Sequence, residues 1–322
     1  MNRKGRRDRR PFLLTFFSIC IILKKTFLAE KTMNIEKWLK NNTCDLSGKT
    51  VAVTGSTGGL GRELCQYLAK LGATLILMDR NKERSERFAE ELWDEYDVDV
   101  KCINVDLEDM DSVKLATDRL LLEDVDVFIH NAGAYSIPRH KCTTGLDNVF
   151  QINFVSPYYI VKRILPKLRQ KKVRVVVVGS IAHNYSKADE NDVDFSTRKQ
   201  ASKVYGNAKR YLMYSLIALF RDEREAKLTI THPGIAFTNI TAHYPKLVFA
   251  IIKYPLKIIF MKPRRACLSI LRGVFDHCEG REWIGPKLFD VWGMPKKKKL
   301  STASEDEIAY ISQKAEEIYK SL

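Results

Sequence analysis

Two side chains four residues apart have the chemistry to move a proton together. Tyr205 and Lys209 lie in the stretch VYGNAKRYLMYSL, whose apolar spacing predicts a helix. Side chains at positions i and i+4 lie on the same helix face, so the ammonium would lie beside the phenol. A phenol titrates near pH ~10, and a neighbouring cation lowers that pKa. The pair fits a general acid/base for alcohol–carbonyl chemistry, although most pairs with this spacing are surface packing.

A glycine-rich turn lies far upstream of this pair. The apolar run Thr50–Thr54 predicts a buried strand, and ELCQYLAKLG after the turn has helical spacing. The turn itself consists of Gly55, Ser56, Thr57, Gly58, Gly59, Leu60 and Gly61. Such a strand-to-helix turn lets the backbone approach a pyrophosphate at the helix N-terminus. The strict G-x-G-x-x-G fingerprint is absent, and an ordinary glycine turn is the alternative.

From about residue 47 to the low 240s, the order of motifs resembles the classical short-chain dehydrogenase/reductase family. The segment Thr54–Gly61 resembles the family's TGxxxGxG turn, and Tyr205 and Lys209 match its YxxxK motif. The remaining matches are Asp106, Leu107, Asn131, Ala132, Gly133, Asn153, Ser180, Pro233, Gly234 and Thr238. The segment between the matching serine and Tyr205 is longer than is usual, as in retinol-dehydrogenase-like members.

The resemblance implies a role for each of these positions. Tyr205 would be the general acid/base, and Lys209 would lower its pKa and hold the nicotinamide ribose. Ser180 would hydrogen-bond the reacting oxygen, and Asn153 would hold a water on the proton path. Taken alone, Ser180 reads as an ordinary serine at the end of a strand. The glycine turn, Asp106-Leu107, the Asn131–Gly133 motif and the Pro233-Gly234 turn with Thr238 would bind the cofactor.

The choice of cofactor depends on two adjacent residues, Asp79 and Arg80, at the end of the second predicted strand. A carboxylate there accepts hydrogen bonds from the adenosine ribose and repels a 2′-phosphate. An arginine there can instead pair with that phosphate. The resemblance implies NAD(H) or NADP(H), and Asp79 favours NAD(H).

Strand-like and helix-like segments alternate, which is the pattern of a parallel sheet covered on both faces. The predicted strands are Thr50–Thr54, Thr74–Met78, Val100–Val105, Val125–His130, Val173–Gly179 and Lys227–Thr231. The predicted helices run to about Leu71, from Asn81 to about Tyr96, to about Leu122, over about Thr144–Arg169 and over about Ser202–Arg224. We expect an α/β fold, a Rossmann-type doubly wound parallel sheet in a single domain, with a small C-terminal substrate lobe at about 235–300.

The segment 241–262 is apolar with interspersed lysines, and Pro245 and Pro255 argue against one straight spanning helix. It reads as a substrate lobe, as a membrane-contacting lobe or as simple core. Beyond it, Arg264–Cys278 predicts a helix and 281–285 a last strand. A terminal helix begins with the capping box Ser304 to Glu307. Its predicted apolar face is Ile308, Ile311, Ala315, Ile318 and Leu322.

The chain is basic, with a net charge of +15 over 322 residues and a run of lysines at Lys296–Lys299. A basic surface can meet nucleic acid or an anionic membrane, but no nucleic-acid-binding module is visible. The seven cysteines are scattered, which argues against a metal site and a disulfide framework and favours a reducing compartment. We therefore expect no metal and no nucleic acid, with a homo-oligomer left open.

Residues 1–32 form a basic and then apolar extension to a domain at 33–322. An apolar run of 13 residues follows a basic start, which is short of the ~20 residues that span a bilayer. It resembles a signal peptide or anchor, and translation starting at Met33 is the alternative. Secretion would separate a nicotinamide enzyme from its cofactor, so we expect a cytoplasmic protein, with membrane association on the cytoplasmic side left open.

Together these patterns and the family resemblance imply an NAD(P)-dependent oxidoreductase that interconverts an alcohol and a carbonyl, with a lipophilic substrate. A non-catalytic nucleotide-binding relative that acts as a membrane or protein partner is one alternative. An extended-family epimerase or dehydratase is another, which the G-x-x-x-G-x-G spacing disfavours. His130, His183 and His232 flank the motifs, but no G-x-S-x-G nucleophile elbow surrounds Ser180, so structural histidines are the better interpretation.

Overall fold

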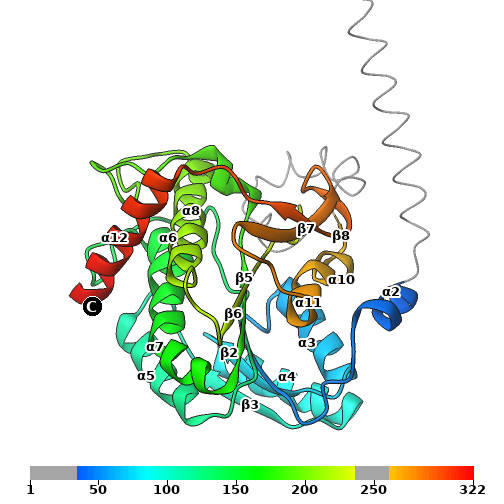
Figure 1. Ribbon diagram of the computed structural model, residues 1–322. Helices are drawn as coiled ribbons and strands as arrows, with labels where there is room; N and C mark the ends of the chain where they lie inside the picture. Colours follow the sequence, from blue (N-terminus) through cyan, green and yellow to red (C-terminus); the bar gives the residue numbers. More distant parts are fainter. Residues whose placement is uncertain (1–34, 236–260) are drawn as a thin grey trace, which may run out of the picture. The chain divides into compact units, whose positions relative to one another are not determined.

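The computed structural model describes residues 35–235 and 261–322, which are drawn as ribbon in Figure 1. By its internal contacts the chain divides into two units, Met1–Asn42 and Thr43–Leu322. The described part of the first unit is helix α2 (Ile35–Asn42), where Asn42 Nδ2 donates to the Trp38 carbonyl at 2.8 Å. The expectations for residues 1–32, for most of the apolar segment 241–262 and for Thr238 lie outside the described residues.

A sheet forms the centre of the second unit (Figure 1). It has eight strands in the order β3-β2-β1-β4-β5-β6-β7-β8. Neighbouring strands from β3 to β7 pair in parallel, and β8 is antiparallel to β7. The strands are β1 (Thr50–Thr54), β2 (Thr74–Asp79), β3 (Val100–Asn104), β4 (Val127–His130), β5 (Arg174–Val178), β6 (Lys227–Thr231), β7 (Glu282–Leu288) and β8 (Trp292–Lys299). The predicted doubly wound α/β fold is therefore confirmed.

The central strands are apolar because helices cover both of their faces. In β1, Val51, Ala52 and Val53 are fully buried, and Val53 pairs in register with Leu77 of β2 and Ile129 of β4. Strand order reverses between β1 and β4, which opens a crevice at the carboxyl ends of these strands. The sequence motifs converge on this edge of the sheet.

The helices form two layers (Figure 1). Contacts join α5, α7, α8 and α12 in one layer and α3, α4, α10 and α11 in the other. The longer helices are α3 (Gly59–Lys70), α4 (Lys82–Tyr96), α5 (Met110–Leu122), α7 (Ser156–Lys171), α8 (Ala201–Leu219), α11 (Leu268–Phe275) and α12 (Glu305–Ser321). Short helices are α6 (Asn148–Phe150) and α10 (Pro263–Ala266).

Several predicted elements differ from the structure. The long helix expected at about 144–169 starts at Asn148 and contains a π-helical turn, Gln151–Val155, before α7. The helix expected to reach Arg224 ends at Leu219, and the predicted helix near 264–278 is two short helices, α10 and α11. Such ends are set by tertiary packing, which propensity alone does not show.

Strand β8 is absent from the predictions, and it contains the lysine run Lys296–Lys299. The sequence WGMPKKKK has little strand propensity, and pairing with β7 decides its conformation. Lysines are common on edge strands because their charge opposes pairing with another chain. Lys298 donates to the Pro286 carbonyl and to Asp290, so part of the run serves the fold.

Helix α12 has the predicted apolar face but only half of the predicted capping box. Ser304 Oγ accepts from the Glu307 N–H at 3.2 Å. The carboxylate of Glu307 binds Arg210 of α8, at 2.6 Å from Nε and 2.6 Å from Nη2. Below it, Ile308, Ile311 and Ala315 are buried. Among residues 35–235 and 261–322, no helix is both long enough and apolar enough to cross a membrane.

Candidate functional site

The glycine turn between β1 and α3 is shaped by close backbone packing. Gly55 has φ +67°, and a Cβ on Gly61 would lie 2.1 Å from the Gly55 carbonyl oxygen. Asn131 after β4 holds the turn, because its Nδ2 donates to the carbonyls of Thr54 at 3.1 Å and Gly55 at 3.0 Å. At Gly58 no described side chain caps α3, so the first-turn N–H groups are available to an anion.

A cavity of about 390 Å³ opens beside this turn at the carboxyl ends of the strands. Predicted cofactor residues that line it are Gly55, Thr57, Gly58, Gly59, Leu60, Gly61, Asp79, Arg80, Asp106, Leu107, Asn131, Ala132 and Gly133. Its glycine cradle and its size fit the predicted dinucleotide. A larger cavity of about 470 Å³ lies near the start of β6 and touches none of the motif residues.

Asp79 is fixed at the end of β2 by the turn residues. Its Oδ1 accepts from the Thr57 N–H at 3.2 Å and from Thr57 Oγ1 at 3.0 Å, and its Oδ2 accepts from Ser56 Oγ. Ser56 therefore acts through Asp79 and does not line the cavity. Arg84, which sequence reasoning missed, lines the cavity and donates to the Thr57 carbonyl at 2.7 Å. No sequence motif marks this arginine, which lies three residues after Asn81, the N-cap of α4.

Tyr205 and Ser180 lie within hydrogen-bonding distance of each other. Burial raises the pKa of Tyr205 to about 12, a hydrogen bond with Ser180 opposes that rise, and nearby Tyr135 adds to it. The Tyr135 ring meets the Tyr205 ring edge-on, with centroids 5.3 Å apart. Ser180 lies two residues after the end of β5 and caps the 3₁₀ turn Ile181–Tyr185, where its Oγ accepts from the Ala182 N–H at 3.2 Å.

Lys209 is buried behind Tyr205. Its Nζ donates to the Val178 carbonyl at 3.0 Å and lies 5.7 Å from the centre of the Tyr205 ring. Burial lowers the pKa of Lys209 to about 7. Burial acts on Tyr205 and Lys209 alike and disfavours both charged forms, so a lowering of the Tyr205 pKa by Lys209 stays a prediction.

Asn153 lies in the π-helical turn and binds the loop after β4. Its Nδ2 donates to the carbonyls of Ala134 and Val149, each at 2.8 Å, and its Oδ1 accepts from the Ala134 N–H at 3.3 Å. A Cβ on Gly133 would lie 2.8 Å from Asn153 Oδ1 and 3.4 Å from Lys209 Nζ. The asparagine, the glycine and the lysine are thus adjacent, and a π turn commonly marks a functional site.

The remaining predicted cofactor residues lie around the same edge. Gly234 follows β6 with φ +78°, and a Cβ there would lie 2.5 Å from the Val291 carbonyl oxygen. Pro233 precedes it and is buried, whereas Thr238 lies outside the described residues. The Asp106 N–H donates to Ser112 Oγ at 2.9 Å, and the Leu107 carbonyl accepts from Ser156 Oγ at 2.7 Å.

The three histidines near the motifs are buried and pack within the protein interior. His130 Nδ1 lies 3.0 Å from Thr54 Oγ1, and burial holds its pKa well below the ordinary value. His183 Nδ1 donates to the Ser180 carbonyl at 2.6 Å, and burial lowers its pKa to about 4. His232 stacks on Trp283, and burial lowers its pKa to about 3. Neutral rings of this kind support the strands, as the sequence suggests.

Comparison of sequences finds relatives across most of the chain. The sequence profile of the short chain dehydrogenase family matches residues 49–205. An uncharacterized oxidoreductase of Schizosaccharomyces pombe is 28% identical over 258 residues, covering 74% of this chain and 76% of that protein. Retinol dehydrogenase 13 of Homo sapiens is 28% identical over 205 residues, covering 62% of each chain. Retinol dehydrogenase 14 of Mus musculus is 27% identical over 275 residues, covering 76% of this chain and 82% of that protein.

Comparison of structures finds the same fold. A crystal structure from Mycobacterium paratuberculosis has a TM-score of 0.67 at 21% identity, covering 87% of this chain and 96% of that one. A short-chain dehydrogenase from Sphingobium yanoikuyae, solved with NADPH, has a TM-score of 0.54 at 21% identity, covering 70% and 83%. The matched profile includes the glycine turn and ends at Tyr205, and the curated relatives include retinol dehydrogenases. This chain therefore belongs to the short-chain dehydrogenase/reductase family.

Proposed function

We propose that Tyr205 is the general acid/base with which this NAD(P)-dependent oxidoreductase interconverts an alcohol and a carbonyl on a lipophilic substrate. The observation that carries the proposal is the grouping of Tyr205 with Ser180 and Lys209, next to Gly133 in the lining of the glycine-turn cavity. A phenol with a pKa of about 12 stays protonated at neutral pH, so it is ready to donate its proton to a carbonyl oxygen.

The nicotinamide cofactor, when bound, supplies or accepts the hydride. Ser180 Oγ would hydrogen-bond the reacting oxygen, where negative charge develops as the carbonyl is reduced. Tyr205 would give its proton to that oxygen, or take it back in the reverse direction. Lys209, with a pKa of about 7, can hold or release a proton near neutral pH and would return one to Tyr205. Asn153 would hold the water that links Lys209 to solvent.

For the cofactor, we propose a preference for NAD(H). The carboxylate of Asp79 is nearly buried and is oriented by Ser56 and Thr57, so its charge cannot swing away from a 2′-phosphate. Arg80 beside it is exposed and can pair with such a phosphate, but its long side chain must be ordered to do so. Repulsion of the 2′-phosphate by the fixed Asp79 carboxylate should therefore outweigh its attraction to the Arg80 side chain. Solved relatives include a complex with NADPH, so both cofactors belong in the test.

Three observations support a lipophilic substrate and a membrane surface. Tyr135 places an aromatic ring beside Tyr205, several relatives are retinol dehydrogenases, and the chain carries a net charge of +15. We propose a cytoplasmic enzyme that meets an anionic membrane through its basic surface, where Lys296 and Lys299 of β8 are exposed.

The decisive experiment is a turnover assay. Purified protein is incubated with NADH or NADPH and a panel of aldehydes and ketones, and with the oxidised cofactors and the matching alcohols. We expect turnover that is fastest with long apolar substrates and with NADH. Nucleotide binding without turnover on any member would contradict the proposal and favour the non-catalytic relative.

A further inference from the structure

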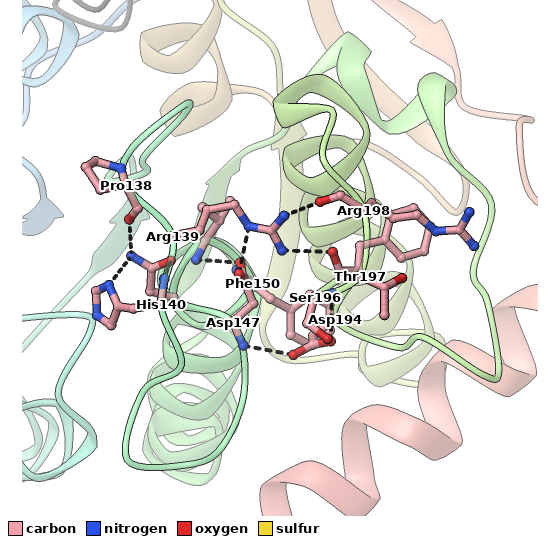
Figure 2. A network of polar contacts seen from close by, with 12 residues as sticks. Pro138, Arg139, His140, Asp147, Phe150, Asp194, Ser196, Thr197 and Arg198 are labelled. Atoms are coloured by element: carbon pink, nitrogen blue, oxygen red, sulfur yellow. Dashed lines mark hydrogen bonds and ion pairs between the residues drawn. The ribbon is translucent and has the colours of Figure 1, made fainter.

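Arg139 joins two loops that are far apart in the sequence (Figure 2). Its Nε donates to Asp147 Oδ2 at 2.8 Å, and its Nη2 donates to the Phe195 carbonyl at 2.8 Å. Its Nη1 donates to the Arg198 carbonyl. One guanidinium therefore ties the loop between β4 and α6 to the long segment that precedes α8.

Asp147 makes the same junction from the other side. Its Oδ1 accepts from the N–H groups of Val149 at 3.0 Å and Phe150 at 3.4 Å, which caps α6. Its own N–H donates to Asp194 Oδ2 at 2.8 Å, as Figure 2 shows. The Asp147 side chain is only 5% exposed, and a buried carboxylate needs a partner of opposite charge. Arg139 supplies that charge.

Phe195 is held in a conformation that a non-glycine residue rarely adopts. Its φ is +55°, in the left-handed region, where an L side chain is strained. Its N–H donates to the Asp192 carbonyl at 3.1 Å, and its carbonyl accepts from Arg139. Strain of this kind persists only where surrounding contacts hold it, and the guanidinium is one of those contacts.

Phe195 is connected both to Tyr205 and to Asn153. The buried ring of Phe195 forms a small cluster with Val149 and Val204, and Tyr205 packs against this cluster. Val204 precedes Tyr205 in α8, and the Val149 carbonyl accepts from Asn153 at 2.8 Å. A shift of Phe195 would therefore reach the general acid/base and the asparagine together.

We propose that Arg139 is a positioning residue, which sets the orientation of Tyr205 and Asn153 through Asp147 and Phe195. The proposal rests on the proposed role of Tyr205 in catalysis. Lysine in place of the arginine would keep a positive charge beside Asp147 but has no planar fork to reach the two carbonyls as well.

The test compares Arg139→Ala and Arg139→Lys with the matched control Arg169→Ala. Arg169 of α7 pairs through Nε with Glu223 Oε2 at 2.6 Å, so the control removes an arginine–carboxylate ion pair elsewhere. Measured quantities are kcat, KM and the affinity for NADH. The ring resonances of Tyr205 are followed in protein labelled with ¹³C-tyrosine and assigned with Tyr205→Phe. The Tyr205 resonances report the ring's orientation against Tyr135 without requiring turnover.

We expect Arg139→Ala to lower kcat by about 10- to 100-fold, the scale of a misplaced catalytic group, while NADH affinity changes little. The Tyr205 resonances should shift, Arg139→Lys should fall between wild type and Arg139→Ala, and Arg169→Ala should match wild type. Unshifted Tyr205 resonances, or an unchanged kcat, in a folded Arg139 variant would overturn the proposal. If Arg139→Ala does not fold, Arg139→Lys decides by the same two readouts. If wild type shows no turnover, the proposed function fails, and the resonances alone decide on positioning.

Discussion

The ammonium of Lys209 donates to the carbonyl of Val178 at 3.0 Å, inside a site where the lysine side chain is almost completely buried. Burial disfavours the charged form, so the pKa of Lys209 falls from 10.5 to about 7. At neutral pH the folded protein therefore holds this proton loosely, whereas an unfolded lysine holds it tightly. The same feature that suits a proton relay reduces stability.

This difference gives stability a pH dependence that Lys209→Met should remove. Between pH 7 and 10.5 the unfolded chain binds the proton and the folded chain does not, so stability rises with pH. Relative to Lys209→Met, wild type should gain roughly 2 kcal/mol in unfolding free energy from pH 7 to pH 9. Urea denaturation at each pH measures it. Lys203→Met, at an exposed position of the same helix, is the control, and parallel curves for wild type and Lys209→Met would contradict the lowered pKa.

Tyr205→Phe should abolish most turnover and leave nucleotide binding nearly intact, because only the transferable proton is lost. Removing a general acid/base costs roughly 10²–10⁴ in rate. Steady-state kinetics and a fluorescence titration with NADH measure the two effects. Tyr96→Phe, at the end of α4, should behave as wild type. Wild-type kcat in Tyr205→Phe would remove the residue from the mechanism.

Asp79→Ala should weaken NADH binding and improve NADPH binding. Hydrogen bonds to charged groups contribute about 1.5–3 kcal/mol, so NADH affinity should fall about 10- to 100-fold. Asp79→Asn is the matched control, because it keeps an acceptor oxygen for Thr57 but removes the charge. Improved NADPH binding in both variants assigns selectivity to the charge. Wild-type protein that already binds NADPH far more tightly than NADH would show that Arg80 dominates.

Glu307→Gln should destabilise the protein much more than Glu305→Gln. Burial works to raise the pKa of Glu307, but hydrogen bonds from Arg210 outweigh it and the pKa lies below its usual value. Arg210 is almost fully buried, and removing one partner of a buried ion pair costs about 3–5 kcal/mol. Glu305 pairs with Arg221 and Arg281 at the surface, where about 1 kcal/mol or less is expected. Thermal and urea unfolding measure the two losses of stability. Equal losses in Glu307→Gln and Glu305→Gln would contradict a larger contribution from the buried ion pair.

Protein beginning at Met33 should sediment with anionic liposomes at low salt. Each lysine or arginine near an anionic surface contributes about 1 kcal/mol, and salt screens that attraction. Binding should fall as salt rises, and neutral liposomes should bind less. Replacing Lys296 and Lys299 with glutamine should weaken the binding without changing turnover of a water-soluble substrate. If the protein does not bind anionic liposomes at low salt, the proposed contact between its basic surface and a membrane is wrong.

The fold was readable from the sequence because its central strands are continuous apolar runs and its turn carries the glycines that close packing demands. Gly61 illustrates this, since any Cβ there would collide with the Gly55 carbonyl. Strand β8 was not readable, because its conformation comes from pairing with β7 and not from its own residues. The π turn around Asn153 is likewise a product of packing against the loop after β4.

For the site, residue types were predictable and their electrostatics were not. The i,i+4 spacing predicts that Lys209 lowers the pKa of Tyr205, but it does not reveal burial, which raises the pKa of Tyr205 and lowers that of Lys209. The arginines were missed for a related reason. Arg84 and Arg139 act on backbone carbonyls, which no sequence motif reveals, and Arg139 reaches across 59 positions to the Arg198 carbonyl.

The contact between Arg210 and Glu307 has a consequence for biosynthesis. During translation, α8 with Tyr205 and Lys209 leaves the ribosome well before α12 does. Until α12 emerges, Arg210 lacks its carboxylate partner, and the apolar surface that Ile308 and Ile311 will cover remains exposed to water. A nascent chain can thus contain Ser180, Tyr205 and Lys209 and still lack α12, which packs against the helix that carries Tyr205 and Lys209. Catalytic competence should therefore appear late, only after release of the terminal helix.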